Sequence, residues 1–402
     1  MHTPLVSLDF RLCAMAEPLE RYTYWLAVSL TPGVGARLAA ELLKRFGAPE
    51  RVFAASLTEL ESCGLPAPVA HAIVSGAPLK AAEQELEKVR QQSCRLLAWD
   101  EPEYPALLKE IYDPPVLLYC RGDVAALSST CLGMVGARSP SPYGTQVTER
   151  LAEELAARGL TIVSGLARGI DSAAQRGALK PTGGKTVAVL GCGIEVDYPK
   201  ENKKLRAQIE ANGCVITEFP LGTFPAPQNF PIRNRIIAGL GWGVVVVEGS
   251  RYSGSLITGR LAMEYNRQVY GIPGNITNQK SHAPNTLIKQ GAKLVETWED
   301  VIEELPTPVR SEILERLAAA GTGSAEQKEL PLAAELSESE RAVFRILKTD
   351  EALHVDQVVE AAGLTPSDVL ASLFDLEMKG LIRQLPGKYF LRVLPAESLS
   401  RS

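Results

Sequence analysis

The strongest constraint on the fold is an alternation of short apolar runs with amphipathic stretches, from about residue 95 onward. Continuous apolar runs separated by helix-length segments are typical of parallel strands buried on both faces. The sequence therefore predicts an α/β fold with a doubly wound parallel sheet. The expected strands are 95–99, 116–120, 132–136, 161–164, 186–190, 214–218, 244–248 and 269–272. The main expected helices between them are 143–158, 170–179, 232–240 and 255–265.

The 402 residues are enough for two or three domains. We expect a flexible tail over 1–20, a small helical domain over 21–90 and the α/β domain over 95–305. A Gly/Ala/Ser/Glu-rich linker is expected over 306–332. The remaining segment, 333–395, has the order of a winged helix, with helices followed by two strands around a Pro-Gly turn.

The net charge of −5 conceals an uneven distribution along the chain. Residues 1–130 contain 12 basic and 16 acidic side chains, a balance of −4, and residues 296–402 contain 11 and 20, a balance of −9. Residues 131–295 contain 19 basic and 11 acidic side chains, a balance of +8. A polyanionic partner is therefore expected on the middle domain.

Composition excludes several other classes of protein. No apolar run approaches the roughly 20 residues of a membrane-spanning helix, and the N-terminal residues lack the pattern of a signal peptide. The seven cysteines are odd in number and contain no C-x-x-C pair, and the four histidines lack metal-ligand spacing. We expect reduced thiols in a cytoplasmic protein that binds neither zinc nor a cofactor.

Glycine-containing loops follow the strands of the middle domain. Ligands of open parallel sheets bind at the carboxyl ends of strands, where glycine lets the backbone approach a phosphate closely. Three of the four loops also carry arginine, whose guanidinium group binds phosphate. Together they predict a site for a phosphate-bearing ligand. The loops are Gly136–Ser139, Ser164–Gly169, Gly191–Gly193 and Gly249–Ser255.

None of the familiar nucleotide or catalytic motifs is complete. Gly183–Thr186 resembles the end of a P-loop, but Leu179 stands where its first glycine belongs, and the segment precedes a strand. Gly191–Gly193 is followed by Val196 where a dinucleotide fingerprint needs glycine. Ser164 is not in a G-x-S-x-G elbow, and none of these loops contains a histidine to activate it.

The sequence contains no convincing nucleophile–base pair and no carboxylate pair with catalytic spacing. Asp171, Glu218 and Glu248 are interpreted as helix-capping or loop-bracing groups. We therefore expect a binding protein rather than an enzyme.

The proline-stiffened segment 224–235 has two open interpretations. Phe230 among cations and amides suits the stacking of a base, and Arg233 and Arg235 suit the neutralisation of phosphates, as in single-strand binders. Alternatively, Phe230 anchors the loop in the core while the two arginines brace carboxylates such as Glu218. The residues alone do not decide between these interpretations.

Six stretches of the middle domain resemble the DNA-processing protein A (DprA/Smf) family, in order and almost without interruption over about 130–295. They are MVGARSPSPYG from Met134, SGLARGIDSAAQRGAL from Ser164, LGCGIEVDYPKEN from Leu190, TEFPLGTFPAPQNFPIRNRIIAGL from Thr217, VVVVEGSRYSGSLITGRLA from Val244 and VYGIPGNI from Val269.

The resemblance implies a Rossmann-like domain that binds single-stranded DNA without base specificity. It also implies a homodimer through this domain and the loading of a RecA-type recombinase onto DNA taken up in natural transformation. Where homologues carry a basic residue before F-P-x-R-N-R, this chain has Pro227 and Gln228.

The site residues that the resemblance implies lie in two motifs and in the other glycine-rich loops. The G-[SA]-R loop supplies Gly136, Arg138 and Ser139, and the F-P-x-R-N-R segment supplies Phe230, Arg233, Asn234 and Arg235. The other loops add Ser164, Gly165, Arg168, Gly169, Ser253, Gly254 and Ser255.

The flanking domains resemble common family attachments in architecture only. Leu30–Gly35 followed by a helix looks like a helix-hairpin-helix, for which the domain charge of −4 favours a structural or accessory role. In the winged helix, the expected recognition helix Ser367–Lys379 carries three acidic residues and one lysine. Such a surface repels phosphates, so we expect a protein contact there; a solvated acidic face is equally compatible.

Two other functions use the same loops. A phosphoribohydrolase of the related fold would hold a mononucleotide and cleave it, but its P-G-G-x-G-T-x-x-E pattern needs a glutamate that Gly249–Gly259 lacks. That segment contains Arg251 and is followed by Arg260. The second alternative is a sensor that binds a small nucleotide without turnover.

Overall fold

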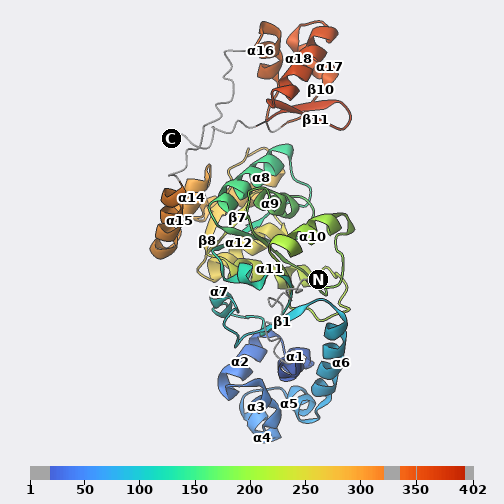
Figure 1. Ribbon diagram of the computed structural model, residues 1–402, viewed down its shortest axis with the longest axis vertical. Coiled ribbons are helices and arrows are strands. Elements are labelled where there is room, and N and C mark those ends of the chain that lie inside the picture. Colours follow the sequence, from blue (N-terminus) through green and yellow to red (C-terminus); the bar gives the residue numbers. More distant parts are fainter. Residues whose placement is uncertain (1–18, 321–335, 350, 394–402) are drawn as a thin grey trace, which may run out of the picture. The chain divides into compact units, whose positions relative to one another are not determined.

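We describe the fold from a computed structural model, which defines residues 19–320, 336–349 and 351–393. The chain divides into two compact units (Figure 1). The first consists of Met1–Glu101 with Tyr112–Tyr119, and the second of Pro102–Ile111 with Cys120–Ser402. The predicted tail falls almost entirely on residues 1–18, outside the described residues.

The first unit is mainly helical and is coloured blue to cyan in Figure 1. Its centre is the packing of α1 against α6, with Trp25 and Leu26 of α1 buried. The α1–α2 turn contains Gly33 at φ +84°, a conformation that favours glycine. The elements are η1 (Leu19–Arg21), α1 (Tyr22–Leu30), α2 (Ala36–Phe46), α3 (Pro49–Ala54), α4 (Leu57–Ser62), α5 (Ala67–Val74), α6 (Ala77–Gln91) and β1 (Arg95–Ala98).

The second unit contains the predicted parallel sheet. Its strands follow the order β6-β5-β4-β3-β7-β8-β9, and every pair from β6 to β9 is parallel. The doubly wound prediction is confirmed. The strands are β3 (Cys131–Val135), β4 (Thr161–Ser164), β5 (Thr186–Val189), β6 (Cys214–Thr217), β7 (Gly243–Val246), β8 (Gln268–Gly271) and β9 (Lys293–Leu294), while β2 (Leu117–Gly122) spans the boundary of the two units.

The chain runs across the sheet from β3 to β6 in one direction, returns to β7 beside β3, and continues in the other direction to β9. Because such crossovers are right-handed, the helices that connect β3 to β6 lie on one face of the sheet, and those that connect β6 to β9 lie on the other. Ile237 of α11 contacts the sheet at Gly133, on the face opposite to the helix α8. The helices are α7 (Ala106–Lys109), α8 (Pro142–Ala157), α9 (Ile170–Ala178), α10 (Lys203–Asn212), α11 (Asn229–Leu240), α12 (Gly254–Glu264), α13 (His282–Lys289), α14 (Trp298–Glu303) and α15 (Thr307–Ala320), with short 3-10 turns η2 (Val124–Ser128), η3 (Lys200–Asn202) and η4 (Gln279–Ser281).

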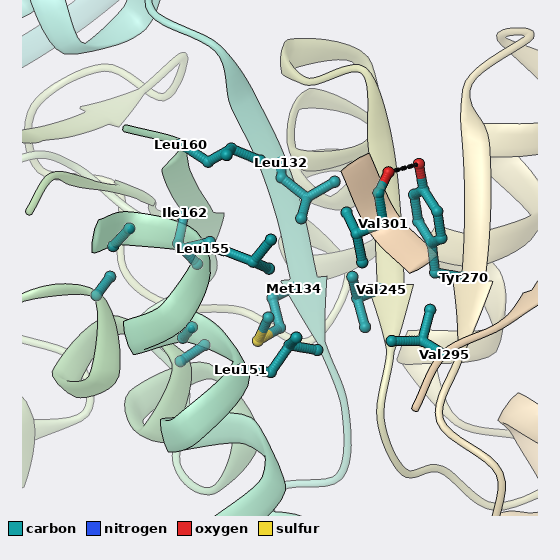
Figure 2. Close-up of a cluster of buried hydrophobic side chains, with 14 of the residues drawn as sticks. Leu132, Met134, Leu151, Leu155, Leu160, Ile162, Val245, Tyr270, Val295 and Val301 are labelled. Atoms are coloured by element: carbon teal, nitrogen blue, oxygen red, sulfur yellow. Dashed lines mark hydrogen bonds between the residues drawn. The ribbon is translucent and has the colours of Figure 1, made fainter. Parts of the chain in front are cut away.

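The main core lies between the sheet and α8. Figure 2 shows Leu151 and Leu155 of α8 directed at Leu132 and Met134 of β3. At its far side the buried Tyr270 hydroxyl donates to the Val301 main-chain oxygen at 3.0 Å. That bond satisfies the only polar group of the Tyr270 side chain, so its ring packs in the core without the cost of an unpaired hydroxyl.

The predicted linker over 306–332 is wrong for Thr307–Ala320, which forms the helix α15. Val309, Ile313 and Leu317 recur every four residues and pack against the main core, and Ile313 is 1% exposed. This helical period, in an Ala-, Leu-, Glu- and Arg-rich stretch, outweighs the linker-like composition. Residues 321–332 lie outside the described residues.

Residues 336–393 form a winged helix with its own buried core (Figure 1, orange to red). Its helix α18 corresponds to the expected recognition helix. The exposed side chains of α18 include Leu370, Phe374 and Met378 as well as the acidic Asp368 and Asp375. The protein-contact role stays a prediction. The elements are α16 (Glu338–Ile346), β10 (Leu353–His354), α17 (Val355–Ala362), α18 (Pro366–Met378), β11 (Ile382–Leu385) and β12 (Tyr389–Arg392), with an antiparallel sheet ordered β10-β12-β11.

Across the described parts of the chain, no helix is long and apolar enough to cross a membrane.

Ile313→Ala tests whether α15 belongs to the main core. Removing this buried side chain should lower the free energy of unfolding by about 2–4 kcal/mol, because a cavity remains. The neighbouring Leu314 is 48% exposed, so Leu314→Ala is the matched control and should change it by less than about 0.5 kcal/mol. Urea-induced unfolding followed by circular dichroism measures both, and equal effects would contradict the packing of α15.

Candidate functional site

A cavity of about 640 Å³ lies at the carboxyl ends of β3 and β7. The helices that follow these neighbouring strands, α8 and α12, cover opposite faces of the sheet, and such a reversal is where open α/β sheets bind ligands. The cavity is lined by residues from the end of β3, from the loops after β3, β4, β5, β7 and β8, from the segment leading into α11, and from the N-terminal parts of α9, α11 and α12. They are Val135–Ser139, Ala167, Asp171, Tyr198, Pro225, Pro227, Phe230, Pro231, Arg233, Asn234, Gly249, Ser250, Ser253–Ser255, Ile257, Thr258 and Lys280.

Aromatic rings and a guanidinium group form one wall of this cavity. The rings of Tyr198 and Phe230 lie 5.7 Å apart at an interplanar angle of 32°. The Cζ atom of Arg138 lies 4.9 Å from the centre of the Phe230 ring, a distance typical of a cation–π contact. Arg138 is exposed and Phe230 half-buried, so Phe230 belongs to the cavity rather than to the core.

The floor of the cavity contains a buried cation. Arg233 is only 4% exposed, and its Nη1 atom lies 3.9 Å from the Asp171 Oδ2 atom. Burial lowers the pKa of Arg233, and the neighbouring Arg138 lowers it further, while Asp171 opposes the shift. In the described structure the Arg233 Nε atom is buried without a hydrogen-bond partner. One N–H donor of this buried guanidinium is therefore left without an acceptor among the described residues.

Asp171 braces the loop after β4. Its Oδ2 atom accepts hydrogen bonds from the Gly165 amide at 3.1 Å and the Ala167 amide at 3.4 Å. Burial raises the pKa of Asp171, whereas Arg233 and these two amides lower it. The bracing interpretation of this carboxylate is confirmed.

Glycine at 165 is required by Arg233. A Cβ atom there would lie 1.4 Å from the Arg233 Nη1 atom. At Gly169, φ is +78° and a Cβ atom would meet the Ala137 oxygen at 2.3 Å. Packing within the chain thus explains both glycines, which the sequence had assigned to phosphate.

Two of the expected arginines lie outside the cavity lining. Arg235 is 4% exposed and forms an ion pair with Glu218. Arg168 is exposed and pairs with Glu201, which raises its pKa. The interpretation in which Arg235 and Glu218 brace each other is thereby confirmed, and a phosphate contact by Arg235 has no support in the geometry.

The first turn of α12 forms another part of the lining. The Ser253 hydroxyl caps the helix by accepting from the Leu256 amide at 3.3 Å, and it lies 2.9 Å from the Ser255 hydroxyl. Amides in the first turn of a helix have no acceptor within the helix, and Gly254 and Ser255 occupy that turn. Asn234 contacts this turn through a weak bond to the Gly254 oxygen at 3.4 Å.

Of the remaining expected residues, two line the cavity and one joins the strands beneath it. Gly136 and Ser139 line the cavity. Ser164 is fully buried and donates from its hydroxyl to the Met134 oxygen at 2.6 Å, joining β4 to β3.

The lining residues that sequence reasoning missed include Tyr198 and Lys280. Tyr198 stands in the loop after β5, within a motif that was noticed only for its glycines. Lys280 follows β8, whose loop has no arginine and no serine-rich pattern. Its position was detectable only from topology, because the loop after β8 shares the edge that holds the other loops. The Lys280 oxygen accepts from the Gly249 amide at 2.6 Å, which holds this loop beside the loop after β7.

A carboxylate also ties the first loop to β7. Glu248 is 4% exposed and accepts from the Ser141 amide at 2.9 Å and the Ser141 hydroxyl at 2.5 Å. Its predicted bracing role is confirmed. Asp171 is then the only carboxylate among the described lining residues. No cluster of three metal-ligating side chains occurs among the described residues.

Comparison with known proteins identifies the family. The family model described as DNA recombination-mediator protein A matches residues 95–306, which is more than half of the chain. The chain belongs to this family. A second model, the DprA winged helix domain, matches residues 327–388. The resemblance to the DprA/Smf family is therefore confirmed for the α/β domain, and the second match agrees with the winged helix expected over 333–395.

Individual DprA/Smf proteins extend the similarity to most of the chain. Protein Smf of Synechocystis sp. is 35% identical over 394 residues, covering 92% of this chain and 98% of its own. DNA processing protein DprA of Streptococcus pneumoniae is 47% identical over 201 residues, covering 50% and 71%. The X-ray structure of DprA from S. pneumoniae superposes with a TM-score of 0.62 at 36% identity, covering 72% of this chain and 98% of that one.

Gly165→Ala tests whether the floor arginine needs glycine beside it. The added methyl group must displace the Arg233 side chain, and overpacking of this kind should lower the free energy of unfolding by about 1–3 kcal/mol. At Gly254 a Cβ atom would meet its nearest neighbour at 3.6 Å, so Gly254→Ala should change it by less than about 0.5 kcal/mol. If urea-induced unfolding gave the two variants the same stability, the close contact would be refuted.

Proposed function

We propose that this DprA/Smf protein binds single-stranded DNA in the cavity between the β3 and β7 loops, without base specificity and without catalysing a reaction. The observation that carries the proposal is the exposed Arg138 guanidinium over the Phe230 ring, above the buried Arg233. One wall of the cavity thus offers both a cation and an aromatic surface. This is the combination with which single-strand binders hold backbone and bases together.

Charge supports a phosphate ligand. Arg138 and Arg233 lie close enough for each to oppose the charge of the other, and Lys280 adds a third cation to the lining against the single carboxylate Asp171. A phosphate placed between these cations would relieve their repulsion. The amides of the first turn of α12 would donate to the same anion.

The aromatic wall favours unpaired DNA over duplex. Tyr198 is 38% exposed and stands beside the half-buried Phe230, so a base can reach the pair of rings. Bases of a duplex are already stacked and paired, whereas those of a single strand are free to stack on protein rings. Stacking is tolerant of base identity, which agrees with binding that ignores sequence.

The cellular role that we propose follows from the family. A protein of the DNA recombination-mediator protein A family that holds single strands is suited to loading a RecA-type recombinase onto DNA taken up in natural transformation. We propose a homodimer through the Rossmann-like domain, acting in the cytoplasm. Co-sedimentation with the recombinase on single-stranded DNA, and analytical ultracentrifugation, test these two points.

The phosphoribohydrolase alternative lacks its acid–base group. The carboxylate in the lining, Asp171, is buried and already bonded to two loop amides. Release of free base from nucleoside monophosphates would nevertheless support this enzyme. Stabilisation by a mononucleotide but not by oligonucleotides, in a thermal-shift screen, would support the nucleotide sensor.

The decisive experiment is a salt series of binding measurements with the full-length chain. Single-stranded DNA should bind more tightly than duplex of the same length and should show a linear fall of log affinity with log salt concentration. Equal affinity for both forms of DNA, or no dependence on salt, would contradict the proposed function.

Arg138→Gln removes the exposed cation while keeping a side chain of similar length. Affinity for single-stranded DNA should fall for every sequence, and the salt slope should flatten by about 0.7, because one phosphate is no longer neutralised. Lys204 is exposed on α10 and does not line the cavity, so Lys204→Gln is the control of equal charge. Fluorescence anisotropy across a salt series measures both. An unchanged slope in Arg138→Gln would remove this residue from the site.

Phe230→Leu separates stacking from charge. Leucine keeps much of the apolar volume but cannot stack on a base, so binding should weaken by about 1–3 kcal/mol. The salt slope should stay that of the unmodified protein, because every cation of the site is kept. Unchanged affinity would mean that Phe230 does not touch the DNA.

A further inference from the structure

A second hollow of about 500 Å³ adjoins the cavity along the loop that leads from β7 into α12. Ser250 lines both spaces. The turn η4 stands between them: Lys280 lines the first cavity, whereas Gln279 and Ser281 line the second. The Asn278 side chain accepts from the Lys280 amide at 3.0 Å and so fixes this turn. A chain leaving the first cavity past Ser250 therefore enters the second hollow.

Large apolar side chains stand exposed around this hollow. Tyr252 is 88% exposed and Ile276 is 92% exposed, and both line it. The Cζ atom of Arg251 lies 5.9 Å from the centre of the Tyr252 ring. An exposed ring with a guanidinium beside it repeats the arrangement of Phe230 and Arg138 in the first cavity.

The charge of the hollow has one sign. Arg251 and Lys289 line it, and no described lining residue is aspartate or glutamate. Both cations are exposed, and neither takes part in an ion pair among the described residues. Two free cations and an accessible ring, without a carboxylate, suit a polyanion that carries aromatic groups.

We propose that this hollow is a second segment of the DNA path, occupied only by strands long enough to extend beyond the first cavity. This inference rests on the proposed function. Arg251 and Lys289 would each neutralise a phosphate, and Tyr252 would stack on a base, so that the bound strand follows the loop between β7 and α12 and crosses η4. The ligand class is unpaired polynucleotide, with no base preference from these contacts.

Length-dependent binding tests the proposal on the full chain. The probes are fluorescent oligothymidylates of about 6 and about 20 nucleotides, chosen to fill one or both hollows. The test variant is Arg251→Gln with Lys289→Gln. The control of equal charge is Lys180→Gln with Lys204→Gln, two exposed lysines outside both linings.

The test variant should bind the short probe like the unmodified protein and the long probe about tenfold more weakly. Its salt slope for the long probe should flatten by about 1.4, for two phosphate contacts. Tyr252→Leu should weaken the long probe about fivefold or more and leave the slope unchanged, because stacking releases no counterions.

Three results would overturn the proposal. In the first, the test variant binds both probes as tightly as the unmodified protein. In the second, the test variant and the control variant lose the same amount of affinity for each of the two probes. Both results leave the first cavity and the proposed function intact. If the unmodified protein bound neither probe, the proposed function would fail as well.

Discussion

The reversal of winding direction between β3 and β7 is the constraint on which the site depends. These strands are hydrogen-bonded neighbours, yet the chain leaves one toward α8 and the other toward α12, on opposite faces of the sheet. The two helix N-termini therefore diverge and leave a crevice between them. The loops after β4, β5 and β8 end at the same edge, and each contributes residues to it.

Within that crevice the arginines have different tasks, set by their depth. Arg138 lies at the surface and can follow a ligand. Arg233 is fixed under it by Asp171 and by the absence of a side chain at Gly165, so its charge is pre-organised. Arg235, two residues further along α11, points to a different partner, Glu218. Positions two apart on a helix do not share a face. One arginine of F-P-x-R-N-R can therefore line the cavity while the other braces a carboxylate.

The sheet, the order of its loops and the placement of the cavity followed from the sequence, because apolar periodicity and glycine position are local signals. Which arginines brace carboxylates and which stay exposed could not be predicted from the sequence, because that depends on which carboxylates the fold brings near each arginine. Lys280 was missed because its loop carries no phosphate-like pattern, and Tyr198 because only the glycines of its loop were weighed. Only the topology, with parallel strands ending at one edge, places them with Arg138. The helix α15 was missed because composition was weighed above the spacing of Val309, Ile313 and Leu317.

The bond pair between Glu248 and Ser141 joins the two rims of the crevice. Glu248 lies two residues after the end of β7, and Ser141 caps α8 through its hydroxyl. The rim after β3 therefore cannot shift relative to β7 without breaking two hydrogen bonds, of 2.5 and 2.9 Å, to a buried carboxylate. These bonds set the spacing of the two rims in the structure. If a ligand enters without changing this spacing, its association rate is governed by diffusion and electrostatic attraction, and ligands differ mainly in their residence times.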